Sequence, residues 1–213
     1  MTQIITKDQI KELDRKVRLN LVNNLSGVKP ANLVGTRATD GQSNLAIINS
    51  VVHIGSDPAM LGFIMRPADG VERHTLNNIR ETGVFTINSV PPNMLAEAHY
   101  TSAKFDRSES EFERCAFTEM ELDGFKAPFV AESVIKIGLQ LTEELEVKSN
   151  GTILIVGTIE MLHVPKNWLE PGTSIDLEAT NLVGIGGLNT YYNLSIAAAF
   201  PYARVHEVPN FKK

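Results

Sequence analysis

Arg73, His74 and Thr75 stand together where a helical pattern begins, and they are the residues of this sequence best suited to bind an anion. The first backbone N–H groups of a helix have no partner within it, and the helix dipole adds partial positive charge there. Arg37 and Arg66 each end a predicted strand, where they either point to one rim or are solvated, and an arginine fork suits phosphate. The cluster predicts a phosphate site, although Thr75 taken alone is more simply interpreted as a helix cap.

Small polar residues interrupt the apolar segment that precedes this cluster. Ser43, Asn44, Asn49 and Ser50 have low strand propensity but stand among Leu, Ala, Ile and Val. Polar side chains on such a strand either face solvent or contact a ligand. The residues alone give no preference between these two interpretations.

Other kinds of site find little support in the sequence. The five histidines show no pairing at metal-ligand spacing, and the single Cys115 provides no thiolate cluster, so we expect no metal. No serine lies in a Gly-x-Ser-x-Gly motif of hydrolases. The glycine run at 184–187 lacks the third glycine of a dinucleotide fingerprint and is interpreted as a tight turn. Cys115 lies in a polar stretch without a nearby base and is predicted to be inert or half-exposed.

Length and composition indicate one compact domain. Of the 213 residues, 43% are hydrophobic, which is enough for one sizeable core. The net charge of −5 favours neither nucleic acid nor an anionic membrane surface. No apolar run approaches the roughly 18 residues of a spanning helix, and the start of the chain lacks the pattern of a secretory signal. We therefore expect a cytoplasmic protein that binds neither nucleic acid nor membrane.

The hydrophobic pattern predicts a mainly β fold with short α-helices. Ile10, Leu13, Val17 and Leu21 indicate one helix, capped by Thr6, that packs on the body of the protein or on a partner subunit. Later segments predict strands at 32–38, 44–54, 60–65, 84–90, 125–131, 132–146 and 152–164, helices at 75–82 and 93–102, and a polar excursion with little core at 108–123. Turns at Asp40-Gly41 and Asn150-Gly151 join strands into hairpins. This order favours a closed or partly split antiparallel barrel.

The order of these motifs resembles the flavin reductase-like family of FMN-binding split barrels. The motifs that carry the resemblance are Val34–Arg37, Asp40-Gly41, Ser43–Ala46, Ser50, Ser56–Pro58, Arg73–Thr75, Asn78–Asn88 and Gly187–Tyr192. The likeness runs from about Pro30 to Arg204, and Asn78–Asn88 is its most specific part.

The resemblance implies a Greek-key split barrel that forms a homodimer, with one flavin per subunit near the interface. It divides the chain into an N-terminal helical extension (1–29), the split-barrel domain (30–205) and a C-terminal tail (206–213). The implied cofactor is FMN, with FAD as the alternative. The flavin-binding residues it implies are Thr36, Arg37, Asn44, Ser50, Val51, Arg66, Arg73, His74, Thr75, Tyr100 and Lys104.

The implied activity is hydride transfer from NADH or NADPH to flavin, which depends on stacking and orientation of two rings more than on an acid or base. The extension before Pro30, and Val51-Val52-His53 where an aromatic residue often follows the serine, depart from common reductases. Two alternatives therefore stay open. One is a flavoredoxin-like electron carrier reduced by a protein partner, and the other is a non-redox dimeric ligand-binding barrel. A monooxygenase is a further candidate partner that would receive reduced flavin.

Overall fold

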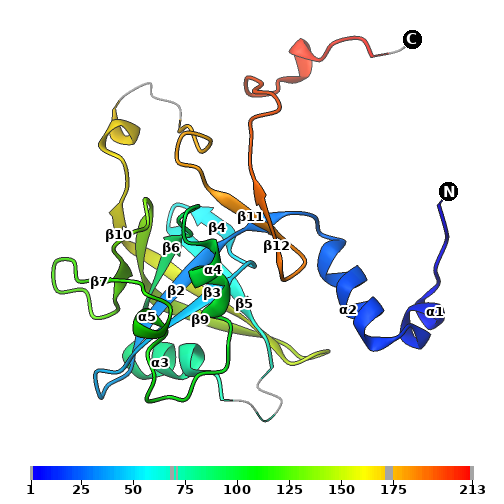
Figure 1. Ribbon diagram of the computed structural model, residues 1–213. Coiled ribbons are helices and arrows are strands. Elements are labelled where there is room, and N and C mark those ends of the chain that lie inside the picture. Colours follow the sequence, from blue (N-terminus) through cyan, green and yellow to red (C-terminus); the bar gives the residue numbers. More distant parts are fainter. Residues whose placement is uncertain (1, 68–69, 71, 171–174, 212–213) are drawn as a thin grey trace.

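The protein is built around one antiparallel sheet of seven strands. A computed structural model describes residues 2–67, 70, 72–170 and 175–211. The seven strands, in spatial order, are β3 (Ser43–Ile48), β2 (Asn32–Arg37), β6 (Val84–Ser89), β9 (Lys136–Val147), β10 (Thr152–His163), β5 (Ala59–Met65) and β4 (Val52–Ser56). The prediction of a mainly β, antiparallel fold is confirmed (Figure 1).

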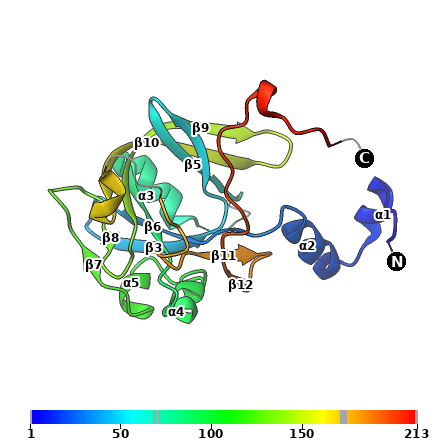
Figure 2. The same ribbon diagram turned by 90° about the horizontal axis from the view of Figure 1, so that it is seen from above.

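Smaller elements surround this sheet (Figures 1 and 2). The helices are α1 (Lys7–Glu12), α2 (Arg15–Asn24), α3 (His74–Thr82), α4 (Leu95–Tyr100), α5 (Glu111–Arg114) and the short 3₁₀ turns η1 (Lys166–Leu169) and η2 (Val205–Glu207). One minor sheet contains β1 (Lys29–Pro30), β11 (Val183–Gly186) and β12 (Thr190–Asn193), and another contains β7 (Glu119–Met120) and β8 (Phe129–Val130).

The seven-stranded sheet curls into a barrel because its two edge strands are neighbours in the chain. β3 and β4 lie at opposite edges of the sheet, yet only residues 49–51 join them. The predicted single strand 44–54 is therefore wrong. Ser50 lies in this link, where its hydroxyl accepts from the Ile64 N–H at 3.1 Å and donates to the Ile64 carbonyl at 3.2 Å. The link thus takes the place of ladder bonds to β5.

Two apolar clusters fill the fold on either side of the sheet. One contains Phe63 and Phe85, which meet edge to face with ring centroids 5.6 Å apart, and it is covered by α3. Gly83 ends α3 with a left-handed backbone at φ 71°, as predicted for the residue that stops this helix. The other cluster lies beneath α4 and α5. Packing against the first apolar cluster therefore fixes the position of α3 and its first turn.

The segment 108–123 contributes more to the core than its polar composition predicts. Phe112, Cys115 and Phe117 are all buried in the second cluster, so the predicted excursion with little core is wrong. These apolar positions are hidden in sequence by the charged residues between them, which face outward. Cys115 is buried rather than half-exposed, and burial raises the pKa of its thiol, as expected of an inert cysteine.

The N-terminal helical segment forms two helices rather than the single one predicted. The carboxylate of Asp14 accepts from the N–H groups of Lys16 and Val17 at 2.9 and 3.3 Å, and so it starts a new helix inside the expected one. Thr6 caps α1 as predicted, in a capping box with Gln9. Neither helix buries a residue, and Figure 1 shows both leading away from the barrel.

The last described segment, 194–211, also leaves the barrel, on the same side as the N-terminal helices (Figures 1 and 2). Its large apolar side chains are exposed: Phe200, Tyr202 and Val205 are 87%, 86% and 93% accessible. Both extensions therefore present unburied apolar surface.

Candidate functional site

A cavity of about 820 Å³ lies between β3, the link 49–51, the end of β5, the start of α3 and the loop after α4. Residues of α2 and of the β11–β12 region contribute further parts of its wall. The predicted site residues that line the cavity are Asn44, Ser50, Arg66, Arg73, His74, Thr75 and Lys104. The structure therefore gathers seven of the eleven residues that the resemblance implies.

The first turn of α3 reaches this cavity without a side-chain cap. The helix begins at His74, and its N-cap residue, Arg73, makes no side-chain capping bond. Thr75 is the second helical residue, and its hydroxyl accepts from Asn44 Nδ2 at 3.0 Å. The interpretation of Thr75 as the cap is therefore wrong. The N–H groups of the first turn remain available to an anion bound in the cavity.

The guanidinium of Arg73 shows a second sign of an incomplete site. One terminal nitrogen donates to the Pro67 carbonyl at 2.9 Å, whereas the buried Nε has no hydrogen-bond partner among the described residues. An unpaired buried donor is costly, and a ligand oxygen that reached it after a small adjustment of the segment would remove that cost. Arg66 and Lys104 line the same cavity. This set of donors suits a phosphate.

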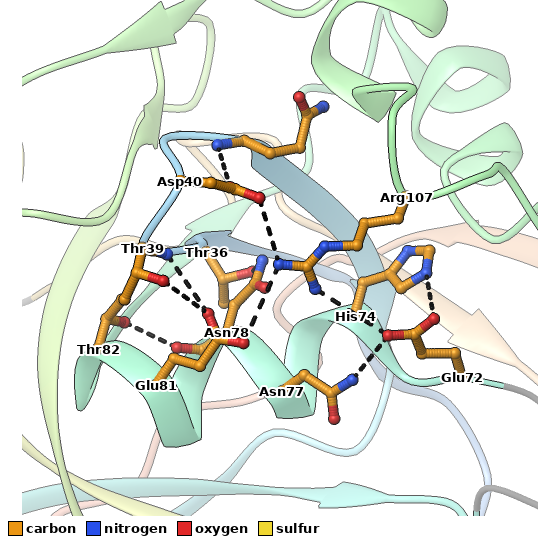
Figure 3. A network of polar contacts seen from close by, with 11 residues as sticks. Thr36, Thr39, Asp40, Glu72, His74, Asn77, Asn78, Glu81, Thr82 and Arg107 are labelled. Carbon is orange, nitrogen blue, oxygen red and sulfur yellow. Dashed lines mark hydrogen bonds and ion pairs between the residues drawn. The ribbon is translucent and has the colours of Figure 1, made fainter.

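Arg107 is a cavity residue that the sequence reasoning missed. Figure 3 shows its guanidinium between three carboxylates, with nitrogen–oxygen distances of 3.5 Å to Asp40, 4.0 Å to Glu72 and 4.0 Å to Glu81. Glu72 also lies 3.7 Å from Nε2 of His74. Arg107 therefore joins the loop after α4 to both ends of α3. The sequence around Arg107 is a polar loop and does not indicate a site, because only the fold brings this residue close to α3.

Four predicted residues lie outside the cavity lining. Thr36 is fully buried and accepts from Asn78 Nδ2 at 3.2 Å. Arg37 pairs with Glu119 at 2.9 Å. Val51 packs against the first apolar cluster, and Tyr100 is 64% exposed at the end of α4. A role for these four in flavin binding stays a prediction.

Side chains from the α4–α5 region cover the outer edge of β3. Thr101 Oγ1 accepts from the Ile47 N–H at 2.9 Å, and Glu111 Oε2 accepts from the Leu45 N–H at 3.0 Å. Both residues line the cavity, and neither was predicted. Burial is the main cause that raises the pKa of Glu111. The need for such acceptors depends on β3 being an edge strand, which the local sequence does not reveal.

The remaining wall of the cavity is apolar, in contrast to the cationic region at the start of α3. Ile47, Ile48, Ile64 and Met65 line the cavity and offer apolar surface to a flat ring. The cationic residues and the open turn of α3 offer donors to a phosphate. The described residues contain no group of three or more His, Cys, Asp and Glu side chains able to hold a metal. No helix among the described residues has the length and apolar character needed to cross a bilayer.

Comparison with known proteins identifies the family of this chain. Residues 28–178 match the model of the flavin reductase like domain, which is well over half of the chain. The chain therefore belongs to the flavin reductase-like family.

Solved structures share the fold. A proposed flavin reductase with a split-barrel domain from Shewanella frigidimarina is 40% identical, with a TM-score of 0.89, over 95% of this chain and 100% of that chain. Nitrilotriacetate monooxygenase component B from Bacillus cereus is 20% identical, with a TM-score of 0.82, over 94% and 99% of the two chains. Flavoredoxin of Desulfovibrio vulgaris is 22% identical, with a TM-score of 0.71, over 83% and 92%. The predicted split barrel is confirmed.

Proposed function

We propose that the protein binds FMN in this cavity and acts as an NAD(P)H-dependent flavin reductase. The observation that carries the proposal is the start of α3, which faces the cavity and for which the described residues provide neither a side-chain cap nor a partner for the nearby Arg73 Nε. Family membership supports a flavin as the ligand. Bound FMN would supply a ring that accepts a hydride, and the chain's own residues would bind and orient it.

Each part of the cavity has a role in this proposal. Arg66, Arg73 and His74, with the N–H groups of the first turn of α3, hold the phosphate. The aliphatic wall formed by β3 and β5 excludes water from the ring. The cavity of about 820 Å³ leaves room for a nicotinamide to stack on the exposed face of the flavin.

The two extensions support a homodimer as part of the same proposal. Val17 and Val22 on α2 and Leu25 at its C-cap are 53%, 50% and 73% exposed, and Val22 also lines the cavity. Large exposed apolar surface of this kind favours burial against another subunit. We therefore propose that a second copy covers the extensions and lies close to the flavin. The division into residues 1–29, 30–205 and 206–213 belongs to this proposal.

The decisive experiment loads the purified protein with FMN and adds excess NADH or NADPH without oxygen. The proposal predicts loss of the oxidised flavin absorbance with one or both nucleotides. Bound flavin that stays oxidised with both, but is reduced by a redox protein, would instead select the electron-carrier alternative. Protein that binds neither FMN nor FAD would contradict any flavin function.

A further inference from the structure

Glu111 is an acidic residue of the cavity wall that has no partner of opposite charge in the described part of the chain. Its side chain belongs to the first residue of α5, only 6% of the residue is exposed, and it lines the cavity wall. Oε2 accepts from the Leu45 N–H at 3.0 Å. Among the described residues, no lysine, arginine or histidine nitrogen lies within 4.0 Å of either carboxylate oxygen. A buried carboxylate in this situation is costly while it is ionised.

The bond to Leu45 does not itself require an acid. Thr101 performs the same task two residues along β3, where a neutral hydroxyl accepts from the Ile47 N–H. A glutamine at 111 would offer the same kind of oxygen to Leu45. The ionisable character of Glu111 is therefore left without a structural explanation, and the carboxyl group remains free to gain or lose a proton.

Charged groups near Glu111 link its protonation to the binding of an anion in the cavity. Burial is the largest influence on the pKa of Glu111 and raises it, whereas the hydrogen bond from the Leu45 N–H and, more weakly, the charge of His74 at the start of α3 lower it. Arg107 and Lys104, from the loop after α4, and Glu72, before α3, line the same cavity. On the other side, beyond α5, Cys115 is close enough for the charge of Glu111 to raise its pKa. A phosphate bound at α3 would add negative charge beside His74, and hence near Glu111.

We propose that Glu111 takes up a proton when a phosphate-bearing ligand binds, so that the cavity accepts the anion and a proton together. This inference rests on the proposed function, in which that ligand is FMN. Two negative groups that share a low-dielectric site cannot both stay ionised without a large penalty. The proton comes from solvent and binds at Oε1, because Oε2 keeps the bond to Leu45. No other bond forms or breaks.

The test compares the parent protein with Glu111→Gln, which keeps an oxygen for Leu45 but cannot ionise. Dissociation constants for FMN and for riboflavin, which lacks the phosphate, are measured by flavin fluorescence between about pH 5 and about pH 8. For each ligand, we divide the dissociation constant of the parent protein by that of the variant. We expect this ratio for FMN to rise between low and high pH. The total rise should be about tenfold for each unit by which bound phosphate raises the pKa of Glu111. The riboflavin ratio should stay constant.

The ratio removes every pH dependence that both proteins share, including that of the phosphate itself. Glu113→Gln is the matched control, because Glu113 is exposed on the same helix. It should follow the parent protein at every pH. An FMN ratio for Glu111→Gln that does not change with pH would overturn the inference, as would an equal pH dependence with riboflavin.

Infrared titration of the Glu111 carboxyl, identified as the band missing in Glu111→Gln, separates this inference from the proposed function. Inorganic phosphate and FMN are added in parallel. Both should raise the pH at which the band disappears. If neither FMN nor riboflavin binds, but inorganic phosphate still raises the pH midpoint of the Glu111 band, the proposed function fails and the inference stands. If both flavins bind but the midpoint does not move, the inference fails and the function stands.

Discussion

Polar residues of the strands and polar residues around the start of α3 differ in how they are satisfied. Thr36, Asn44 and Ser50, on or just after β2 and β3, all have partners within the protein: Asn78, Thr75 and the backbone of Ile64. At the start of α3, by contrast, the described residues provide no side-chain cap for the helix and no hydrogen-bond partner for Arg73 Nε. The strand residues therefore fasten the barrel, and the helix start keeps unused donors for a ligand.

This difference revises the interpretation of polar interruptions in an apolar strand. From the sequence, such side chains are expected to contact either solvent or a ligand. In the structure two of them, Asn49 and Ser50, instead bond to backbone groups of this chain that have no partner in a neighbouring strand. The Ser50 hydroxyl bonds to the N–H and carbonyl of Ile64, and Asn49 Nδ2 donates to the Gly187 carbonyl at 2.9 Å. A contact to flavin from Ser50 would come in addition to these bonds.

The largest expected effect is on ligand binding at the start of α3. Arg73→Glu should weaken FMN binding by about a hundredfold or more, because it removes a charge-assisted fork and places a carboxylate beside the phosphate. The measurement is FMN titration by fluorescence quenching. Arg15→Glu, the same reversal at the exposed start of α2, is the control and should leave the affinity unchanged. Equal affinities of Arg73→Glu and the parent for FMN would contradict the claim that the start of α3, unlike the strand residues, binds the ligand.

A smaller effect, on stability rather than on affinity, is expected for the strand residues. Ser50→Ala leaves the Ile64 N–H and carbonyl without their partner and should lower the free energy of unfolding by about 1–2 kcal/mol. Urea denaturation measures this change, with Ser149→Ala as the control, because Ser149 is exposed in the turn between β9 and β10. A stability equal to that of the parent, together with a large loss of FMN affinity, would assign Ser50 to the ligand instead.

The sequence predicts the parts of the fold that depend on local chemistry. Gly83 ends α3, Asn150-Gly151 turns the long hairpin and Thr6 caps α1, because each effect is set by residues close together in the chain. Seven of the eleven residues that the resemblance implies line the cavity, and their role in binding flavin stays a prediction.

The remaining features depend on topology and stayed hidden. The break at residues 49–51 follows from β3 and β4 occupying opposite edges of one sheet, which no local pattern encodes. Arg107 and Glu111 enter the cavity only because the loop after α4 and α5 fold over β3 and α3. Their polar surroundings in sequence are the same as those of solvated residues. The buried Phe112 was missed for the same reason.

The most direct measurement of the central claim is the affinity of the parent protein for FMN against that for riboflavin, in one buffer at low ionic strength. The two ligands carry the same ring and differ in the phosphate. If the start of α3 binds that phosphate, FMN should bind about a hundredfold more tightly. Equal affinities for the two ligands would contradict the account, because the open turn and Arg73 would then contribute nothing to binding.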